Sequence, residues 1–448
     1  MKVDFSASLQ KDFIVLFYFL PFFSFLASQE PKEFNKLNEL LEYVNKKNST
    51  LNNLELDKKI TKINKNASNV NIFNFRVPVI SQFNYNPINQ VGFFPAIFFG
   101  GKVGEFVETP TSPQYNFTFS IQPQLEIVNF VAISQSKLAK INEKLVESKS
   151  NLTKQNIYEE INNCYFNILL LKEQKIIFTQ ILQNANKIKE IVSNKYKEGF
   201  VRKTDLNEAE NTVISIENNI NQVEIELEKQ QLFLNLFVEN EIKPLLNEQL
   251  ISYENESYFL EVNNNLPIEN MKLQYRFSET EHKLSKSLTL PVISFFSNLS
   301  LQNASNSYFF NADANWITNQ TIGLRLSWDL PLNFNTLTNI STKKIQAAIL
   351  KTKLDHLEKE NNVVKKQIIL DFKKYIETAK NDKKIYLLKK ENFEKTQNQY
   401  LENLTSLDKL LFSLSESMNS KLNLVNTLSK VGLFKNKIQL LNKINSLL

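Results

Sequence analysis

Histidine and cysteine, the residue types that most often bind soft metals, are scarce in this chain of 448 residues. The two histidines, His282 and His356, lie among polar residues in helical patterns, and Cys164 is the one cysteine. Zinc sites are built from clusters of cysteine and histidine, so we expect no metal site. A glycine-rich phosphate loop and a nucleophile elbow are also absent from the sequence. The composition argues against an enzyme and predicts neither catalytic residues nor a cofactor.

The charged residues give little sign of a binding surface. The formal net charge of +6 is spread along the chain instead of forming a basic patch, so we expect no nucleic-acid partner. The many carboxylates alternate with lysines on helices, as is typical of solvated faces. Cys164 falls on the apolar side of a helical pattern with Ile161 and Ile168 and is predicted to be a small core residue.

The first 28 residues have the layout of a secretory signal peptide. Lys2 and Lys11 precede an apolar run over 13–26, and Ala27 and Ser28 follow it. A single membrane anchor is the alternative, but the run is short for a spanning helix and contains Pro21. We expect residues 1–28 to be removed during export.

Two segments, 115–127 and 321–333, alternate between apolar and polar side chains. This period of two predicts a strand whose two faces have different surroundings. About 10 to 13 residues is also the length of a tilted strand that crosses an outer membrane. The side chains expected to face lipid are Phe117, Phe119, Ile121, Leu324, Leu326 and Trp328. The loop 86–114 before the first segment is rich in aromatic residues, which suits a membrane interface, although a loop plug is the competing interpretation.

A long helical pattern follows each alternating segment. Proline is absent between Pro123 and Pro244, and again after Pro331. Apolar residues in these stretches recur at spacings of three and four, which predicts helical hairpins with coiled-coil packing. The first helix would have about 70 residues and a length of roughly 100 Å.

The turn of the first hairpin contains Tyr196, Gly199 and Asp205. Glycine readily adopts the left-handed conformation that ends a helix. Asp205 and Glu208 have the spacing of a capping box for the next helix. An alternative is that acidic residues here ring a pore entrance and favour cations, but a structural cap is the simpler interpretation of Asp205.

The turn of the second hairpin contains Tyr400, Asn403 and Asp408. Asparagine replaces the glycine and also tolerates the left-handed conformation. This turn has one residue fewer between its tyrosine and its aspartate. Asp408 is the second candidate for an acidic entrance.

The chain reads as two copies of one unit, a strand pair followed by a helical hairpin. The sequence P-V-I-S occurs at 78–81 and again at 291–294. The expected segments are a signal peptide (1–28), N-terminal helices (29–75), a first β-hairpin (76–127), a first helical hairpin (128–240), a linker with a short helix (241–287), a second β-hairpin (288–333) and a second helical hairpin (334–448). The fold class is therefore mixed, with a membrane β-barrel joined to a long α-helical coiled-coil barrel.

Four strands per chain cannot close a barrel, and an open sheet edge in lipid would leave backbone groups unpaired. Two chains would supply eight strands, which enclose only side chains, whereas three chains would supply twelve and leave a conduit. We therefore expect a homotrimer in contact with outer-membrane lipid.

With these elements the chain resembles the TolC-type outer-membrane efflux proteins over nearly its whole mature length. The resemblance rests on L-N-E-L-L-E-Y-V-N-K-K-N-S-T-L at 37–51, on W-D-L-P-L-N at 328–333 and on the two hairpin turns. It implies a trimeric channel-tunnel with its barrel in the outer membrane and its helices in the periplasm. It also implies a periplasmic adaptor and an inner-membrane pump of the RND or ABC type as partners, and passive export of small molecules or proteins. The rival interpretation is a periplasmic adaptor or coiled-coil scaffold, which would have one helical hairpin flanked by small glycine-rich β domains.

Overall fold

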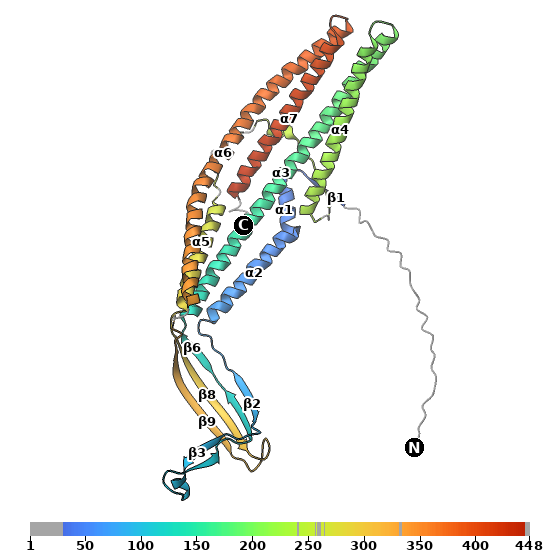
Figure 1. The fold of residues 1–448 in the computed structure, drawn as a ribbon. Helices are drawn as coiled ribbons and strands as arrows, with labels where there is room; N and C mark the ends of the chain where they lie inside the picture. The colour runs from blue at the N-terminus through green and yellow to red at the C-terminus, as the bar shows by residue number, and fades with distance from the viewer. Residues whose placement is uncertain are drawn as a thin grey trace, which may run out of the picture.

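A computed structural model describes residues 30–239, 242–255, 257, 261–263, 265–330 and 334–443. The chain is elongated, with two long helical hairpins at one end and a curved sheet at the other (Figure 1). The predicted signal peptide lies outside the described residues, as do 331–333 at the end of the second predicted strand.

Each long hairpin pairs two helices that lie side by side (Figure 1). Helix α3 (Phe130–Lys197) packs against α4 (Lys203–Phe237), and α6 (Phe334–Leu401) packs against α7 (Leu407–Lys443). Both α3 and α6 have 68 residues, which corresponds to roughly 100 Å of helix. Neither contains a proline or glycine that would interrupt its hydrogen bonds.

Three shorter helices lie along the sheet-proximal half of the hairpins. Helix α1 (Leu37–Lys47) and α2 (Ser49–Val70) pack on α3, and α5 (Leu266–Ser287) packs on both α3 and α6. The break between α1 and α2 falls at Asn48, whose side chain accepts a hydrogen bond of 3.2 Å from the Leu51 amide. This is the N-cap arrangement that asparagine favours.

A small parallel sheet lies beside the middle of α3, where β1 (Glu30–Phe34) pairs with β7 (Ile242–Leu246). The expectation that residues 29–75 are helical is wrong for this first segment. Its pairing partner lies about 200 residues away along the chain, and local helical pattern carries no information about such a partner.

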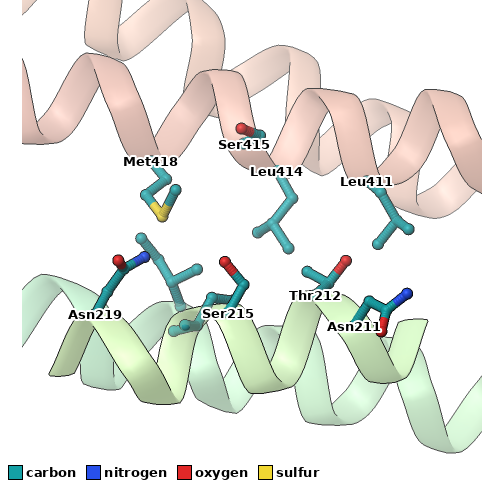
Figure 2. A pocket seen from close by; sticks show the side chains of 10 residues that line it. Asn211, Thr212, Ser215, Asn219, Leu411, Leu414, Ser415 and Met418 are labelled. Atoms are coloured by element: carbon teal, nitrogen blue, oxygen red, sulfur yellow. The ribbon is translucent and has the colours of Figure 1, made fainter. Parts of the chain in front are cut away.

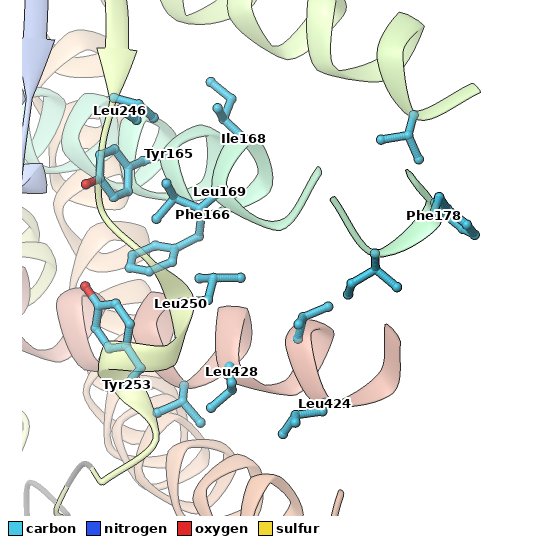
Figure 3. Close-up of a cluster of buried hydrophobic side chains, with 14 of the residues drawn as sticks. Tyr165, Phe166, Ile168, Leu169, Phe178, Leu246, Leu250, Tyr253, Leu424 and Leu428 are labelled. Atoms are coloured by element: carbon cyan, nitrogen blue, oxygen red, sulfur yellow. The ribbon is translucent and has the colours of Figure 1, made fainter. Parts of the chain in front are cut away.

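The largest buried side chains gather next to this small sheet, where α3 and α7 meet the one-turn helix η2 (Leu250–Tyr253) (Figure 3). Tyr165 and Phe166 are fully buried, and the Phe166 ring meets the Tyr253 ring edge to face at 5.4 Å between centroids. This cluster joins the first hairpin to the second.

The larger sheet has the strand order β2 (Val79–Tyr85), β5 (Tyr115–Ile121), β8 (Val292–Ser305) and β9 (Trp316–Ser327), all antiparallel. Strand β6 (Gln124–Val128) pairs with β8 next to β5, so β5 and β6 share one position in the sheet. The single strand predicted at 115–127 is therefore two, because Pro123 has no amide hydrogen for the ladder. The strand predicted at 321–333 is also misplaced, since β9 begins and ends several residues earlier.

The loop expected at 86–114 contains a second hairpin, formed by β3 (Val91–Pro95) and β4 (Phe106–Pro110) with η1 (Ala96–Phe99) between them. It projects from the end of the large sheet that is remote from the helices (Figure 1). Hydrogen bonds at its base, from the Thr111 amide to the Gln90 carbonyl and from the Asn86 amide to the Gln114 carbonyl, are both 2.7 Å long. They attach the hairpin to the ends of β2 and β5.

Candidate functional site

The large sheet has one apolar and one polar face, as its strand register shows. Phe119 pairs with Leu301, and Thr318 follows on β9, whereas the adjacent Thr118 pairs with Gln302. The apolar face carries Val79, Phe83, Tyr85, Tyr115, Phe117, Phe119, Ile121, Leu125, Ile293, Phe295, Leu299, Leu301, Trp316, Ile322, Leu324 and Leu326. Side chains alternate across a strand, so all of these point to one side.

The apolar face is uncovered in a single chain. Leu324 is 70% exposed and Leu326 is 65% exposed. Contiguous exposed apolar surface of this extent marks an interface with protein or membrane. Trp328 lies just beyond β9, and its Nε1 donates a hydrogen bond of 3.1 Å to the Thr289 carbonyl oxygen, which holds the indole at the helix-proximal end of the sheet.

Aromatic rings gather at the opposite end of this face. The Phe117 ring lies 4.7 Å from Phe310 and 4.8 Å from Phe83 between centroids, and Tyr85 lies 5.0 Å from Tyr115. Tyrosine, tryptophan and phenylalanine at strand ends are typical of the boundary between hydrocarbon and water.

The opposite face is lined mainly by amides and hydroxyls. Its polar side chains are Gln82, Asn84, Asn116, Thr118, Ser120, Gln124, Glu126, Ser294, Asn298, Ser300, Gln302, Asn319, Thr321, Arg325 and Ser327. Gln302 Nε2 donates to Asn116 Oδ1 at 2.9 Å across two strands. The large apolar residues of the paired strands on this side are Ile80, Val292, Phe296 and Ile317. Apart from Glu126 and Arg325, the polar side chains on this face are neutral hydrogen-bonding groups.

The two hairpin turns at the far end of the helices have the same backbone design. Gly199 has φ +80° and Asn403 has φ +61°. The Phe200 amide donates to the Lys195 carbonyl at 2.9 Å, and the Leu404 amide donates to the Gln399 carbonyl at 2.8 Å. Both are the six-to-one hydrogen bonds of a Schellman motif. The sequence predicted the left-handed conformation at these two positions.

Asp205 caps its helix, but not as the N-cap residue that its spacing with Glu208 predicted. Helix α4 begins at Lys203, which makes Asp205 its third residue. The Arg202 amide donates to Asp205 Oδ2 at 2.9 Å, so Asp205 supplies the returning half of a capping box. At the second turn Ser406 is the cap, because the Lys409 amide donates to its Oγ at 3.4 Å. Asp408 is the second residue of α7.

Lys195 links the two turns, a role that no sequence pattern indicated. Its Nζ donates to Asn403 Oδ1 at 2.6 Å and to the Tyr400 carbonyl at 3.1 Å, and it lies 4.3 Å from the centroid of the Tyr400 ring. Tyr400 is buried, whereas Tyr196 at the matching position is 40% exposed. Burial, and to a smaller degree the charge of Asp205, raises the pKa of Tyr400.

Between the turns and the buried core, α4 and α7 face each other across a cavity of about 290 Å³ (Figure 2). Asn211, Thr212, Ser215 and Asn219 of α4 lie opposite Leu411, Leu414, Ser415 and Met418 of α7. Polar side chains of α4 therefore face mainly apolar side chains of α7 across this cavity.

The remaining candidates for chemistry are the histidine, cysteine and carboxylate side chains. Among the described residues, no three His, Cys, Asp or Glu side chains come together as a metal site. Cys164 is buried as predicted, and burial raises the pKa of its thiol to about 12. Over the same part of the chain, none of the helices combines the length and apolarity needed to span a membrane.

Residues 87–236 match the family model described as outer membrane efflux protein. The predicted resemblance to the TolC-type outer-membrane efflux proteins is thereby confirmed. Among curated protein sequences, none matches the chain significantly.

Solved structures of bacterial outer membrane proteins share the fold over most of the chain. The outer membrane protein VceC from Vibrio cholerae superposes with a TM-score of 0.73 at 12% identity, over 90% of this chain and 95% of that one. The CmeC outer membrane channel of Campylobacter jejuni gives 0.72 at 12% identity, over 90% and 85%. The open MtrE outer membrane channel of Neisseria gonorrhoeae gives 0.67 at 11% identity, over 90% and 88%. CmeC and MtrE are outer membrane channels and VceC is an outer membrane protein.

Proposed function

We propose that three copies of this chain form an outer-membrane channel that conducts small molecules or proteins out of the periplasm. The observation that carries the proposal is the large sheet with its uncovered apolar face, its amide-lined opposite face and its two open edges. In the part of the chain that the structure describes, β2 pairs with β5 alone and β9 pairs with β8 alone. In hydrocarbon the free backbone groups of these edges must pair.

Pairing β9 of one copy with β2 of the next closes the sheet. The sheet has four strand positions, so three copies supply twelve strands. The apolar face then contacts lipid through Phe117, Phe119, Ile121, Leu324 and Leu326, with Trp328 at the membrane boundary. The amide-lined face surrounds the lumen.

The helical hairpins continue the conduit into the periplasm. Their surfaces carry exposed apolar residues that neighbouring copies would cover, among them Ile214, Ile225, Val363, Leu370 and Leu387. Coiled-coil packing between copies buries such rows. The turns with Tyr196, Gly199, Asp205, Tyr400, Asn403 and Asp408 form the free end, where we expect a periplasmic adaptor and an inner-membrane pump of the RND or ABC type to engage. The pump would supply the energy for transport.

An acidic entrance remains a subordinate proposal. Asp205 and Asp408 would lie near the narrow end of the tunnel, where rings of carboxylates favour cations. The hydrogen bond from the Arg202 amide to Asp205 supports the capping role instead. Conductance of Asp205→Ala trimers separates the two: unchanged ion selectivity and unchanged block by multivalent cations would leave only the cap.

The mass of the detergent-solubilised protein and its conductance in planar bilayers test the main proposal. We expect three chains per particle and stepwise ohmic conductance. A monomer with no conductance would overturn it. A peripheral scaffold, the rival class, would be released from membranes by alkaline carbonate without detergent.

A further inference from the structure

The large sheet carries almost no charge on its lumen side. Among β2, β5, β8 and β9, Arg325 is the only charged residue. It lies on the amide-lined face, near the end of β9 that leads into the helices, and it is exposed. We propose that Arg325 makes the barrel segment selective for anions, including carboxylate-bearing solutes. This inference rests on the proposed channel function.

Contacts within the sheet hold the Arg325 guanidinium in place. Arg325 Cζ lies 4.6 Å from the centroid of the Phe296 ring on the neighbouring strand β8. This is the distance range of a cation–π contact. Phe296 pairs with Gly323, and a Cβ at position 323 would lie only 3.1 Å from the Phe296 ring. Gly323 thus leaves room for the ring that supports Arg325 at the lumen wall.

Three other charged residues, Glu126, Arg76 and Asp329, lie at the same end of the sheet. Glu126 on β6 and Arg325 on β9 are both paired with Ser294 of β8, so they stand two strand spacings apart, about 10 Å. Glu126 is only 8% exposed and accepts a hydrogen bond of 2.7 Å from Asn74 Nδ2. Arg76, just before β2, is exposed and donates to Gln124 Oε1 at 2.9 Å. Within the paired strands of the large sheet and the bridge at Arg76, the exposed charges are therefore positive, and the Glu126 carboxylate is withdrawn from water. Asp329, two residues beyond the end of β9, is an exposed carboxylate at the margin of this face.

Three copies of Arg325 would form a ring of like charge in a wall of neutral amides. Rings of arginine or lysine favour anions in water-filled pores. Three charges at a distance on the order of 15 Å from the axis change the relative permeability of anions and cations by about two- to fourfold in dilute salt. The Debye length is about 10 Å at 0.1 M ionic strength and about 3 Å at 1 M, so the preference should fade in concentrated salt.

Reversal potentials of purified channels in planar bilayers under a potassium chloride gradient test the inference. We expect Arg325→Gln to lower the chloride-to-potassium permeability ratio by about two- to fourfold at about 0.1 M salt. Arg325→Lys should keep the wild-type ratio. Thr321, on the same strand and the same face, offers a rescue: Arg325→Gln combined with Thr321→Arg should restore the anion preference. These substitutions leave the acidic residues elsewhere in the tunnel unchanged, so a difference between variants reports on the barrel segment.

Glu126→Gln serves as the matched control, since it changes charge by one unit at a buried carboxylate and should shift the ratio less than Arg325→Gln does. An Arg325→Gln channel that conducts with the wild-type permeability ratio would overturn the inference and leave the channel proposal intact. Absence of conductance in the wild-type protein would instead overturn the channel proposal.

Discussion

The hydroxyl of Tyr165 donates a hydrogen bond of 2.7 Å to Oε2 of Glu248, and this contact joins the middle of α3 to the segment that follows β7. Tyr253 donates to the other carboxylate oxygen of Glu248 at 2.8 Å. Tyr165 is fully buried, and burial, followed by the bond to Glu248, raises its pKa. The carboxylate therefore ties α3 and η2 together at the point where the two helical hairpins share a core.

We expect Tyr165→Phe to destabilise the protein by about 1–3 kcal/mol, because it leaves a partly buried carboxylate with one donor fewer while the ring packing is retained. Thermal unfolding of the solubilised protein, followed by circular dichroism, measures the effect. Tyr196→Phe removes a hydroxyl from an exposed side chain and should leave the transition unchanged. Equal effects of the two substitutions would contradict the role assigned to the Glu248 contact.

Gly432 of α7 lies against the buried Phe166 ring, and a Cβ there would come within 2.2 Å of the ring. Gly432→Ala forces the ring or the helix to move, and overpacking of this kind costs about 1–3 kcal/mol. The unfolding midpoint in denaturant should fall accordingly. Shortening the opposing side chain in the double variant Gly432→Ala with Phe166→Leu should recover part of the loss. No recovery would show that the clash with Phe166 is not the cause.

Neighbouring positions on β5 test which face of the sheet contacts lipid. Phe119 is on the apolar face and Thr118 on the amide-lined face. A lysine on the lipid side of a membrane strand costs about 2–4 kcal/mol near the bilayer centre, so Phe119→Lys should abolish insertion of the folded trimer. Thr118→Lys should insert and retain conductance. Membrane fractionation and heat-modifiable electrophoretic mobility provide the measurement, and the reverse pattern would exchange the two faces.

Only certain residues should be tolerated at Gly199, the left-handed position in the connection between α3 and α4. Gly199 has φ +80°, a conformation that costs a β-branched residue at least about 1–2 kcal/mol. Gly199→Val should lower the stability of the α3–α4 turn and raise its rate of proteolysis. Gly199→Asn introduces the residue type that the second turn uses at Asn403 and should be nearly neutral. Equal protease sensitivity of both variants would argue against backbone strain.

The Cys164 thiol should be inert in the folded protein. Burial raises the pKa of the thiol from its usual 9.0 to about 12, and Sγ donates to the Gln230 carbonyl at 3.3 Å. An aromatic disulfide reagent at pH 8 should therefore react only after unfolding. Because the folded-state pKa is the higher one, the neutral thiol is stabilised by folding, and this contribution is lost as pH rises from about 9 to about 12. Cys164→Ser should remove the pH-dependent term.

The sequence alone determined the elements whose signal is local. The lack of proline and glycine over α3 and α6 defined two long helices, and Gly199 and Asn403 marked their ends through conformations that few residues adopt. Period-two alternation at 115–127 identified the two faces of β5 before any pairing was known. The sequence correctly predicted that Asp205 caps α4 but assigned it the wrong position in the cap. Several nearby residues are compatible with the start of this helix.

Tertiary structure decided whatever depended on distant partners. The pairing of β1 with β7, the division of one strand into β5 and β6 on β8, and the β3–β4 hairpin all follow from hydrogen bonds between segments that local pattern does not connect. Lys195 and Arg325 look like ordinary charged residues in the sequence. Only the folded chain brings Lys195 to the connection between α6 and α7, and Arg325 to the Phe296 ring. The role of each side chain depends on which strands and helices become neighbours.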